Sequence, residues 1–196
     1  MKVYMGKVSG NSYKLRILLA LLKAPHEELI IDLKNKEHKG AAFLKINPRG
    51  EVPALEDDGK IFWDSAACLV YVARKFGGEQ WLPTDAAGLA EVTQWLVLAA
   101  TEIQCGLQYA RRGVQMGRWT LGTLEEGQSF GRIALDIAEA RLQKHDWLAL
   151  GRPTIAEPAC YPYIETAPEG NVALEPYPAI IKWMERCKKL PGWPER

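Results

Sequence analysis

The feature that most constrains the fold of this chain is a change of sequence pattern near residue 80. Up to residue 78, short apolar runs typical of strands alternate with helical patterns in the order βαβαββα. Beyond a polar segment at 79–87, only helical patterns remain. A length of 196 residues suits one domain or two small ones. The sequence therefore predicts an α/β domain over 1–78, a linker over 79–87 and an all-α domain over 88–196.

The strand signals of the first half predict a mixed sheet. The run 27–33 has a continuous apolar centre, which is typical of a strand buried on both faces. Asp58-Gly59, between two short apolar runs, predicts a hairpin with a tight turn. A helical crossover makes the first two strands parallel, and the hairpin adds an antiparallel edge. The other expected elements are a strand at 2–5 and helices at 11–23, 41–46, 65–76, 88–118, 124–146, 154–167 and 176–189.

Composition and charge exclude several classes of protein. The net charge is +1, so bulk charge selects no nucleic-acid partner. The segment "MKVYMGKVSG" lacks the apolar core of a signal peptide, and no apolar run is long enough to span a bilayer. We therefore expect a cytoplasmic protein with no membrane partner.

The cysteines and histidines do not form a metal-binding pattern. Four cysteines, Cys68, Cys105, Cys160 and Cys187, lie far apart, no CxxC pair occurs, and only three histidines are present. We expect no metal site, and we expect each cysteine to be a buried, reduced core residue.

Three stretches carry a resemblance to a known family. "NPRGEVPALEDDGKIFWDS" at 47–65 resembles the central signature of cytosolic glutathione transferases. "PTIAEPACYPYI" and "PYPAIIKWMERCKKLPGW" are similar to the sixth helix and the closing segment of that family. The resemblance implies a thioredoxin-like domain followed by a helical domain, glutathione as the co-substrate, and a homodimer.

The resemblance also implies how the first domain binds glutathione. Proteins similar to this one have a cis bond before the proline of Val52-Pro53, and the backbone of Val52 pairs with the cysteinyl part. Ser65 holds the γ-glutamyl carboxylate at a helix N-terminus, which attracts anions, and Asp64 meets the amine. A proline that merely opens an edge strand, and a helix capped by Ser65, are the simpler alternatives.

Charged residues flank these positions. The resemblance implies that His38 and Lys39, in the polar segment "KNKEHK", meet the glycine carboxylate of glutathione; a solvated loop is the alternative. Glu51 departs from the Gln or Lys of many relatives. Its carboxylate would repel the glycine carboxylate unless Arg49 or Lys39 offsets it.

Thiol activation is expected in the stretch "SGNSYK" at 9–14. A free thiol has a pKa of about 8.5, so a hydrogen-bond donor and a helix N-terminus must favour the thiolate. Ser9 matches the serine of zeta-like members, and Asn11 matches the asparagine of nu-like and yeast prion-like members. We expect Ser9 to be the first donor and Asn11 the second, with simple helix capping as the alternative. Ser12 is expected to be a cap or a supporting residue.

Other motifs have mainly structural interpretations. Tyr4 lies within a strand and is expected to be structural, whereas Tyr13 comes after the helix start. Thr154-x-x-Glu157 is a capping box that resembles the folding motif of the family.

A pocket for the second substrate is expected on the first helix of the second domain. Tyr109, Arg112 and Met116 have helical spacing and would share one face, which is equally consistent with a solvated or interface face.

The function predicted from these residues is glutathione transfer to a small, partly apolar electrophile. Glutathione-dependent peroxide or disulfide reduction is the nearest alternative, because nu-like members use asparagine. A double-bond isomerase of the zeta type is less favoured because its cysteine is missing. A non-catalytic assembly module would be expected to lose the activating residue or the Asp64-Ser65 pair, and both are present.

Overall fold

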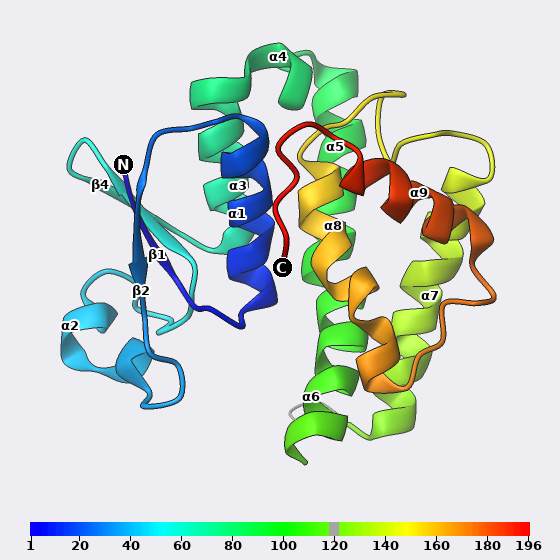
Figure 1. Cartoon of the computed structure of the whole chain (residues 1–196), viewed down its shortest axis with the longest axis horizontal. Helices are drawn as coiled ribbons and strands as arrows, with labels where there is room; N and C mark the ends of the chain where they lie inside the picture. Colours follow the sequence, from blue (N-terminus) through cyan, green and yellow to red (C-terminus); the bar gives the residue numbers. More distant parts are fainter. Residues whose placement is uncertain (118–121) are drawn as a thin grey trace.

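The computed structural model describes residues 1–117 and 122–196, and it has the predicted two-part architecture (Figure 1). The first part is a four-stranded sheet in the order β2-β1-β3-β4. Strand β2 runs parallel to β1, and β3 runs antiparallel to both β1 and β4. The elements are β1 (Lys2–Met5), α1 (Gly10–Leu21), β2 (Glu27–Ile30), α2 (Ala41–Leu44), β3 (Ala54–Asp57), β4 (Lys60–Trp63) and α3 (Ser65–Val72).

Strand β2 corrects one expectation. It ends at Ile30 and it is not buried on both faces, because it is one of the two edge strands of the sheet. Glu27, Glu28 and Ile30 are exposed. Asp32 follows, and its carboxylate accepts hydrogen bonds from the backbone N–H groups of the next turn, which ends the strand.

The predicted hairpin is present between β3 and β4. Asp58 and Gly59 have φ of 49° and 73°, the left-handed conformations that a tight hairpin turn requires. Two residues after β4, helix α3 begins at Ser65. The expectation that Ser65 caps this helix was wrong: Asp64 is the N-cap, and its carboxylate accepts from the backbone N–H of Ala66 at 2.9 Å. An aspartate fits this role because its short side chain reaches the second helical N–H.

The second part is helical, and no strand occurs in the described residues beyond β4. The segment predicted as a linker contains a short helix, α4, and the predicted helix 88–118 is interrupted at Thr101 (φ −105°, ψ −94°). The π-helical segment η3 then crosses α7 so closely that a Cβ on Gly106 would collide with the backbone of Gly131. The elements are α4 (Gly78–Trp81), α5 (Ala86–Ala100), η3 (Ile103–Gln108), α6 (Tyr109–Met116), α7 (Leu124–Leu142), α8 (Ala156–Glu165), the 3₁₀ turn η4 (Ala167–Gly170) and α9 (Pro178–Lys188).

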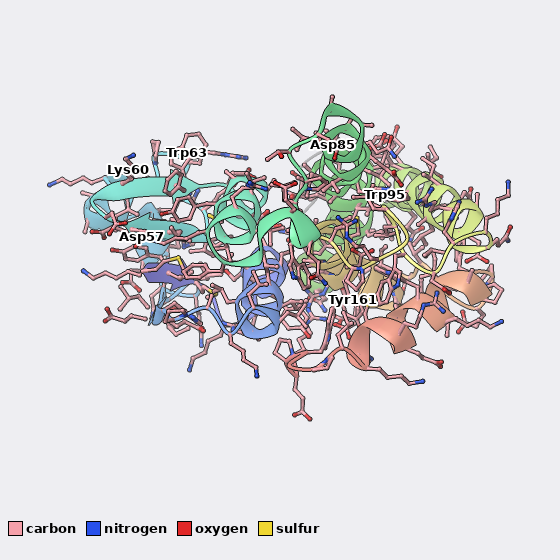
Figure 2. All side chains as sticks on the ribbon, turned by 90° about the horizontal axis from the view of Figure 1, so that it is seen from above. Asp57, Lys60, Trp63, Asp85, Trp95 and Tyr161 are labelled. Atoms are coloured by element: carbon pink, nitrogen blue, oxygen red, sulfur yellow. The ribbon has the colours of Figure 1, made fainter. Side chains whose placement is uncertain are left out.

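Helices α1 and α8 join the two parts (Figure 1). Seen from above, Asp57, Lys60 and Trp63 mark the sheet, whereas Trp95 and Tyr161 lie among the helices (Figure 2). The C-terminal segment returns between α1 and α8 (Figure 1). There the Tyr13 hydroxyl donates to the carbonyl of Pro194 at 3.0 Å, and the Trp193 ring lies 4.7 Å from the Tyr161 ring. The last residues therefore tie the first domain to the second.

The cysteines are all free, as expected, but one is less buried than predicted. Cys68, Cys160 and Cys187 lie in the core, whereas Cys105, on η3, is half-buried. In residues 1–117 and 122–196, no helix combines the length and the apolar character that a membrane crossing needs. The same residues contain no cluster of metal-ligating side chains.

Candidate functional site

The N-terminus of α1 is the first component of the site. Ser9 is the N-cap, and its hydroxyl oxygen accepts from the backbone N–H of Ser12 at 3.2 Å. The buried hydroxyl of Ser12 accepts in turn from the backbone N–H of Gly6 at 3.0 Å. Ser12 therefore has a supporting role, as predicted, and it fixes the turn between β1 and α1.

A tyrosine from α8 packs against this helix start. The ring of Tyr163 lies so close to Gly10 that a Cβ at that position would collide with it. Burial raises the pKa of Tyr163, and a hydrogen bond from the backbone N–H of Asn11 opposes that rise. Only glycine allows this approach, so Gly10 is what brings the second domain to the start of α1.

One turn further along α1, Lys14 is buried in the interface between the domains. Its exposed fraction is only 2%. Its ammonium lies 5.0 Å from the centre of the Tyr163 ring, and it forms no ion pair within the part of the chain that the structure describes. Burial lowers the pKa of Lys14 to about 8. A positive charge therefore lies behind the start of α1.

The N-terminus of α3 is the second component. Asp64 has φ of 79°, a conformation that is costly for a residue with a side chain and that often marks functional sites. The hydroxyl of Ser65 is nearly buried and donates to the Oδ1 of Asn11 at 3.4 Å. This contact joins the starts of α1 and α3, so the positive dipole ends of two helices lie next to each other.

The turn before Val52 is the third component. The Asn47 side chain holds this turn: its amide nitrogen donates to the carbonyl of Glu51 at 2.7 Å, and its oxygen accepts from the backbone N–H of Arg49 at 3.0 Å. The guanidinium of Arg49 contacts Asp64 at 2.9 Å and Glu51 at 3.3 Å. The peptide bond between Val52 and Pro53 is cis, as the resemblance implied.

These three components line a small, open, polar cleft. Five of the residues predicted for glutathione line it together, from both helix starts and the proline turn. The full lining is Asn11, Asn47, Arg49, Glu51, Val52, Pro53, Asp64, Ser65 and Gln104.

Three of the other predicted site residues lie beside the cleft and do not line it. Ser9 is on the same turn as Asn11. His38 and Lys39 are on the neighbouring 3₁₀ turn, where Lys39 donates to the backbone carbonyl of Arg49 at 3.1 Å. Burial and the adjacent Lys39 charge lower the pKa of His38. This turn therefore supports the loop that carries Arg49.

The predicted substrate face on α6 also lies outside the cleft lining. Tyr109 and Arg112 are half-buried, whereas Met116 is 59% exposed.

Two residues of the lining were missed by sequence reasoning. Gln104 lies on η3, and the irregular backbone at Thr101 changes the register that a regular helix would have. Asn47 is buried and polar, and its place in the "NPRG" turn was the signal that could have identified it.

Other predicted roles have the following outcomes. The Tyr4 hydroxyl donates to Glu56 at 2.9 Å within the sheet, which agrees with a structural role. The N-cap of α8 is Ile155, one residue later than the capping box implies. The Glu157 carboxylate nevertheless accepts from the backbone N–H of Thr154 at 2.7 Å, and the Thr154 hydroxyl oxygen accepts from that of Ala156 at 3.1 Å.

Comparisons with known proteins agree with this geometry. Residues 8–75 match the model of the glutathione S-transferase N-terminal domain, and residues 131–191 match that of the C-terminal domain. Glutathione S-transferase 1 of Manduca sexta is 30% identical, with 97% of this chain and 88% of that protein covered. The maleylpyruvate isomerase of a Ralstonia species is 28% identical, with 97% and 93% covered.

Solved structures extend the likeness to the whole fold. A glutathione S-transferase from Pseudomonas fluorescens is 32% identical with a TM-score of 0.90, and 99% of this chain and 97% of that one are covered. This chain therefore belongs to the glutathione S-transferase family.

Proposed function

We propose that this enzyme is a glutathione transferase that binds glutathione in the cleft between the starts of α1 and α3. The observation that carries the proposal is the contact between Ser65 and Asn11, which brings two helix N-termini to one polar cleft. Helix N-termini stabilise anions, and bound glutathione presents carboxylates and a thiolate. Ser65 and Asp64 would bind the γ-glutamyl end, and the backbone of Val52 would pair with the cysteinyl part.

The thiol would lie at the start of α1, where Asn11 is the primary donor in our proposal. Asn11 lines the cleft, and its Oδ1 already accepts from Ser65, so its amide N–H groups remain available to donate. Ser9 lies beside the cleft and has a hydroxyl hydrogen to donate while its oxygen caps the helix. The sequence analysis had Ser9 as the first donor and Asn11 as the second, so this proposal reverses their order. The positive charge of Lys14, behind the N-terminus of α1, would also stabilise the thiolate.

The test is to compare Asn11→Asp, Asn11→Ala and Ser9→Ala. Losing a donor to a charged acceptor costs roughly 1.5–3 kcal/mol, so Asn11→Ala should raise the pKa of the bound thiol by about one to two units. Turnover of a chlorodinitrobenzene probe at about pH 6.5 should fall about 10- to 100-fold. Asn11→Asp keeps the size and removes the donor, so it should cost at least as much.

Ser9→Ala is the matched comparison, and we expect the smaller effect. A larger effect of Ser9→Ala would make Ser9 the primary donor. If none of the three variants moves the thiol pKa, which thiolate absorbance reports, the start of α1 is only a capped helix and the proposed activation is wrong.

The second substrate would be a small electrophile that enters between the domains. Gln104 lines the cleft from the helical side, and Tyr109, Arg112 and Met116 continue from it along α6. Peroxide or disulfide reduction and a non-catalytic assembly role are not favoured by the relatives. A panel of electrophiles with a hydroperoxide and a mixed disulfide would measure the preference directly. A role in detoxification would fit broad electrophile use.

We also propose a cytoplasmic homodimer in which the first domain of one copy packs on the second domain of the other. Exposed apolar side chains on β4 and α3 (Ile61, Trp63 and Val70) and on α7 (Phe130, Ile133 and Ile137) support this arrangement. Sedimentation should give twice the chain mass of 21.9 kDa at micromolar concentration. A stable species of the single-chain mass would contradict the dimer.

A further inference from the structure

The charged side chains of the cleft form a triad in which one guanidinium contacts two carboxylates. Arg49 contacts both Asp64 and Glu51, and these three are the charged residues of the lining. Two carboxylates therefore share one guanidinium, and the lining has one net negative charge. Any anionic group that enters must compete for Arg49 or rely on helix N-termini alone.

The pairs are exposed, so they are easily exchanged. The side chains of Arg49, Asp64 and Glu51 are 47%, 39% and 54% exposed. Ion pairs in contact with water contribute little to stability, so a ligand that brings both charges replaces the Arg49–Asp64 contact at small cost. The electrostatic attraction between these groups and the ligand becomes stronger when the ligand excludes water from the cleft.

We infer that Arg49 is a further binding residue, and that it joins Ser65 in binding the carboxylate of an α-amino acid group whose ammonium replaces the guanidinium on Asp64. An α-amino acid end carries an ammonium and a carboxylate on one carbon, so it can insert into the Arg49–Asp64 pair and leave every charge paired. This assignment rests on the proposed function, and the group would be the γ-glutamyl end of glutathione. Arg49 is well suited, because a planar guanidinium binds a carboxylate through two parallel hydrogen bonds.

Glu51 opposes the binding of the ligand carboxylate to Arg49. Its carboxylate holds the second edge of the guanidinium, so it competes with the ligand for Arg49. Glu51 thereby tunes affinity: a neutral residue at this position would release Arg49 to the ligand. The Lys39 ammonium donates to the backbone carbonyl of Arg49, so it leaves the exchange to the guanidinium.

The experiment compares two ligands on the full-length wild type, Arg49→Gln and Glu51→Gln by calorimetry. The ligands are glutathione and γ-aminobutanoyl-cysteinylglycine, which lacks only the α-carboxylate. Arg49→Gln should bind glutathione about tenfold more weakly, since it loses a charge-assisted hydrogen bond. The same variant should bind the decarboxylated analogue as well as wild type or more tightly, because Asp64 is then free. Glu51→Gln should bind glutathione about threefold more tightly.

The outcomes separate this inference from the function on which it rests. If wild type binds glutathione and Arg49→Gln binds it equally well, the assignment of Arg49 is wrong and the proposed function stands. An equal loss for both ligands would show that Arg49 only shapes the turn, which also overturns the assignment. If wild type binds no glutathione, the proposed function and this inference fall together.

Discussion

Two helix N-termini in this protein are capped by side-chain oxygens, but one has a structural role and the other faces the binding cleft. At α8, the Glu157 carboxylate accepts from the N–H groups of Thr154 and Leu148, and all three residues are fully buried. At α1, Ser9 caps one N–H while Asn11 faces an open cleft. The first start is saturated from within the chain. The second leaves donors that a ligand can use, so hydrogen-bond saturation, and not the motif, separates a structural helix start from a binding one.

The largest effect on stability is expected at the N-terminus of α8, which we call the closed start because its N–H groups are bonded within the chain. Glu157→Ala leaves the buried N–H groups of Leu148 and Thr154 without an acceptor, at about 1–3 kcal/mol each. We expect urea unfolding to show a loss of about 3–5 kcal/mol, with glutathione affinity of the folded fraction unchanged. Glu157→Gln keeps one acceptor oxygen and should lose less. A loss below about 1 kcal/mol for Glu157→Ala would break the contrast.

An intermediate effect on stability is expected at Lys14, near the N-terminus of α1, which we call the open start because it faces the cleft. Its pKa of about 8 lies below the usual value of 10.5, so the folded state releases the proton first. The unfolded chain then holds more protons between about pH 8 and 10.5, and stability rises with pH in that window. Lys14→Met should remove this rise and stabilise the protein at pH 7 by about 2–3 kcal/mol.

Chemical denaturation of wild type and Lys14→Met at neutral and alkaline pH checks this prediction. A variant that keeps the alkaline rise would show that another group causes it. If the gain in stability comes with slower glutathione turnover, the buried charge serves the open start at the expense of stability.

The smallest effect is expected from Ser9→Ala on stability. Ser9 accepts one hydrogen bond at a half-buried position, so its loss should cost about 1 kcal/mol, and Ser9→Gly only a few tenths. Thermal unfolding measures both. A cost as large as that of Glu157→Ala would mean that α1 has a closed start too.

Local signals predicted most of the fold and part of the site. The hairpin follows from Asp58-Gly59, because only a few residue pairs adopt its two left-handed conformations. The pairing of Asp64 and Ser65 at a helix start was also visible, although the order of cap and first helical residue was not. Capping depends on backbone angles that the sequence constrains only loosely.

The remaining features depend on tertiary placement. The exposure of β2 follows from its edge position, which an apolar run does not reveal. Gln104 enters the cleft because η3 is wound more widely than an α-helix, so regular spacing selected a different face. The Arg49 triad joins two segments, the turn at 49–51 and Asp64, and the sequence gave no sign that the guanidinium that offsets Glu51 would also contact Asp64.

The contact between Tyr13 and Pro194 has a consequence for biosynthesis. The face of α1 that Pro194 and Trp193 cover belongs to the domain that leaves the ribosome first, and its cover is made only after the second domain. At 5–20 residues per second, the intervening chain takes on the order of ten to forty seconds to synthesise. During that interval the nascent first domain would present an uncovered apolar helix, so we expect it to engage chaperones until residue 194 has emerged.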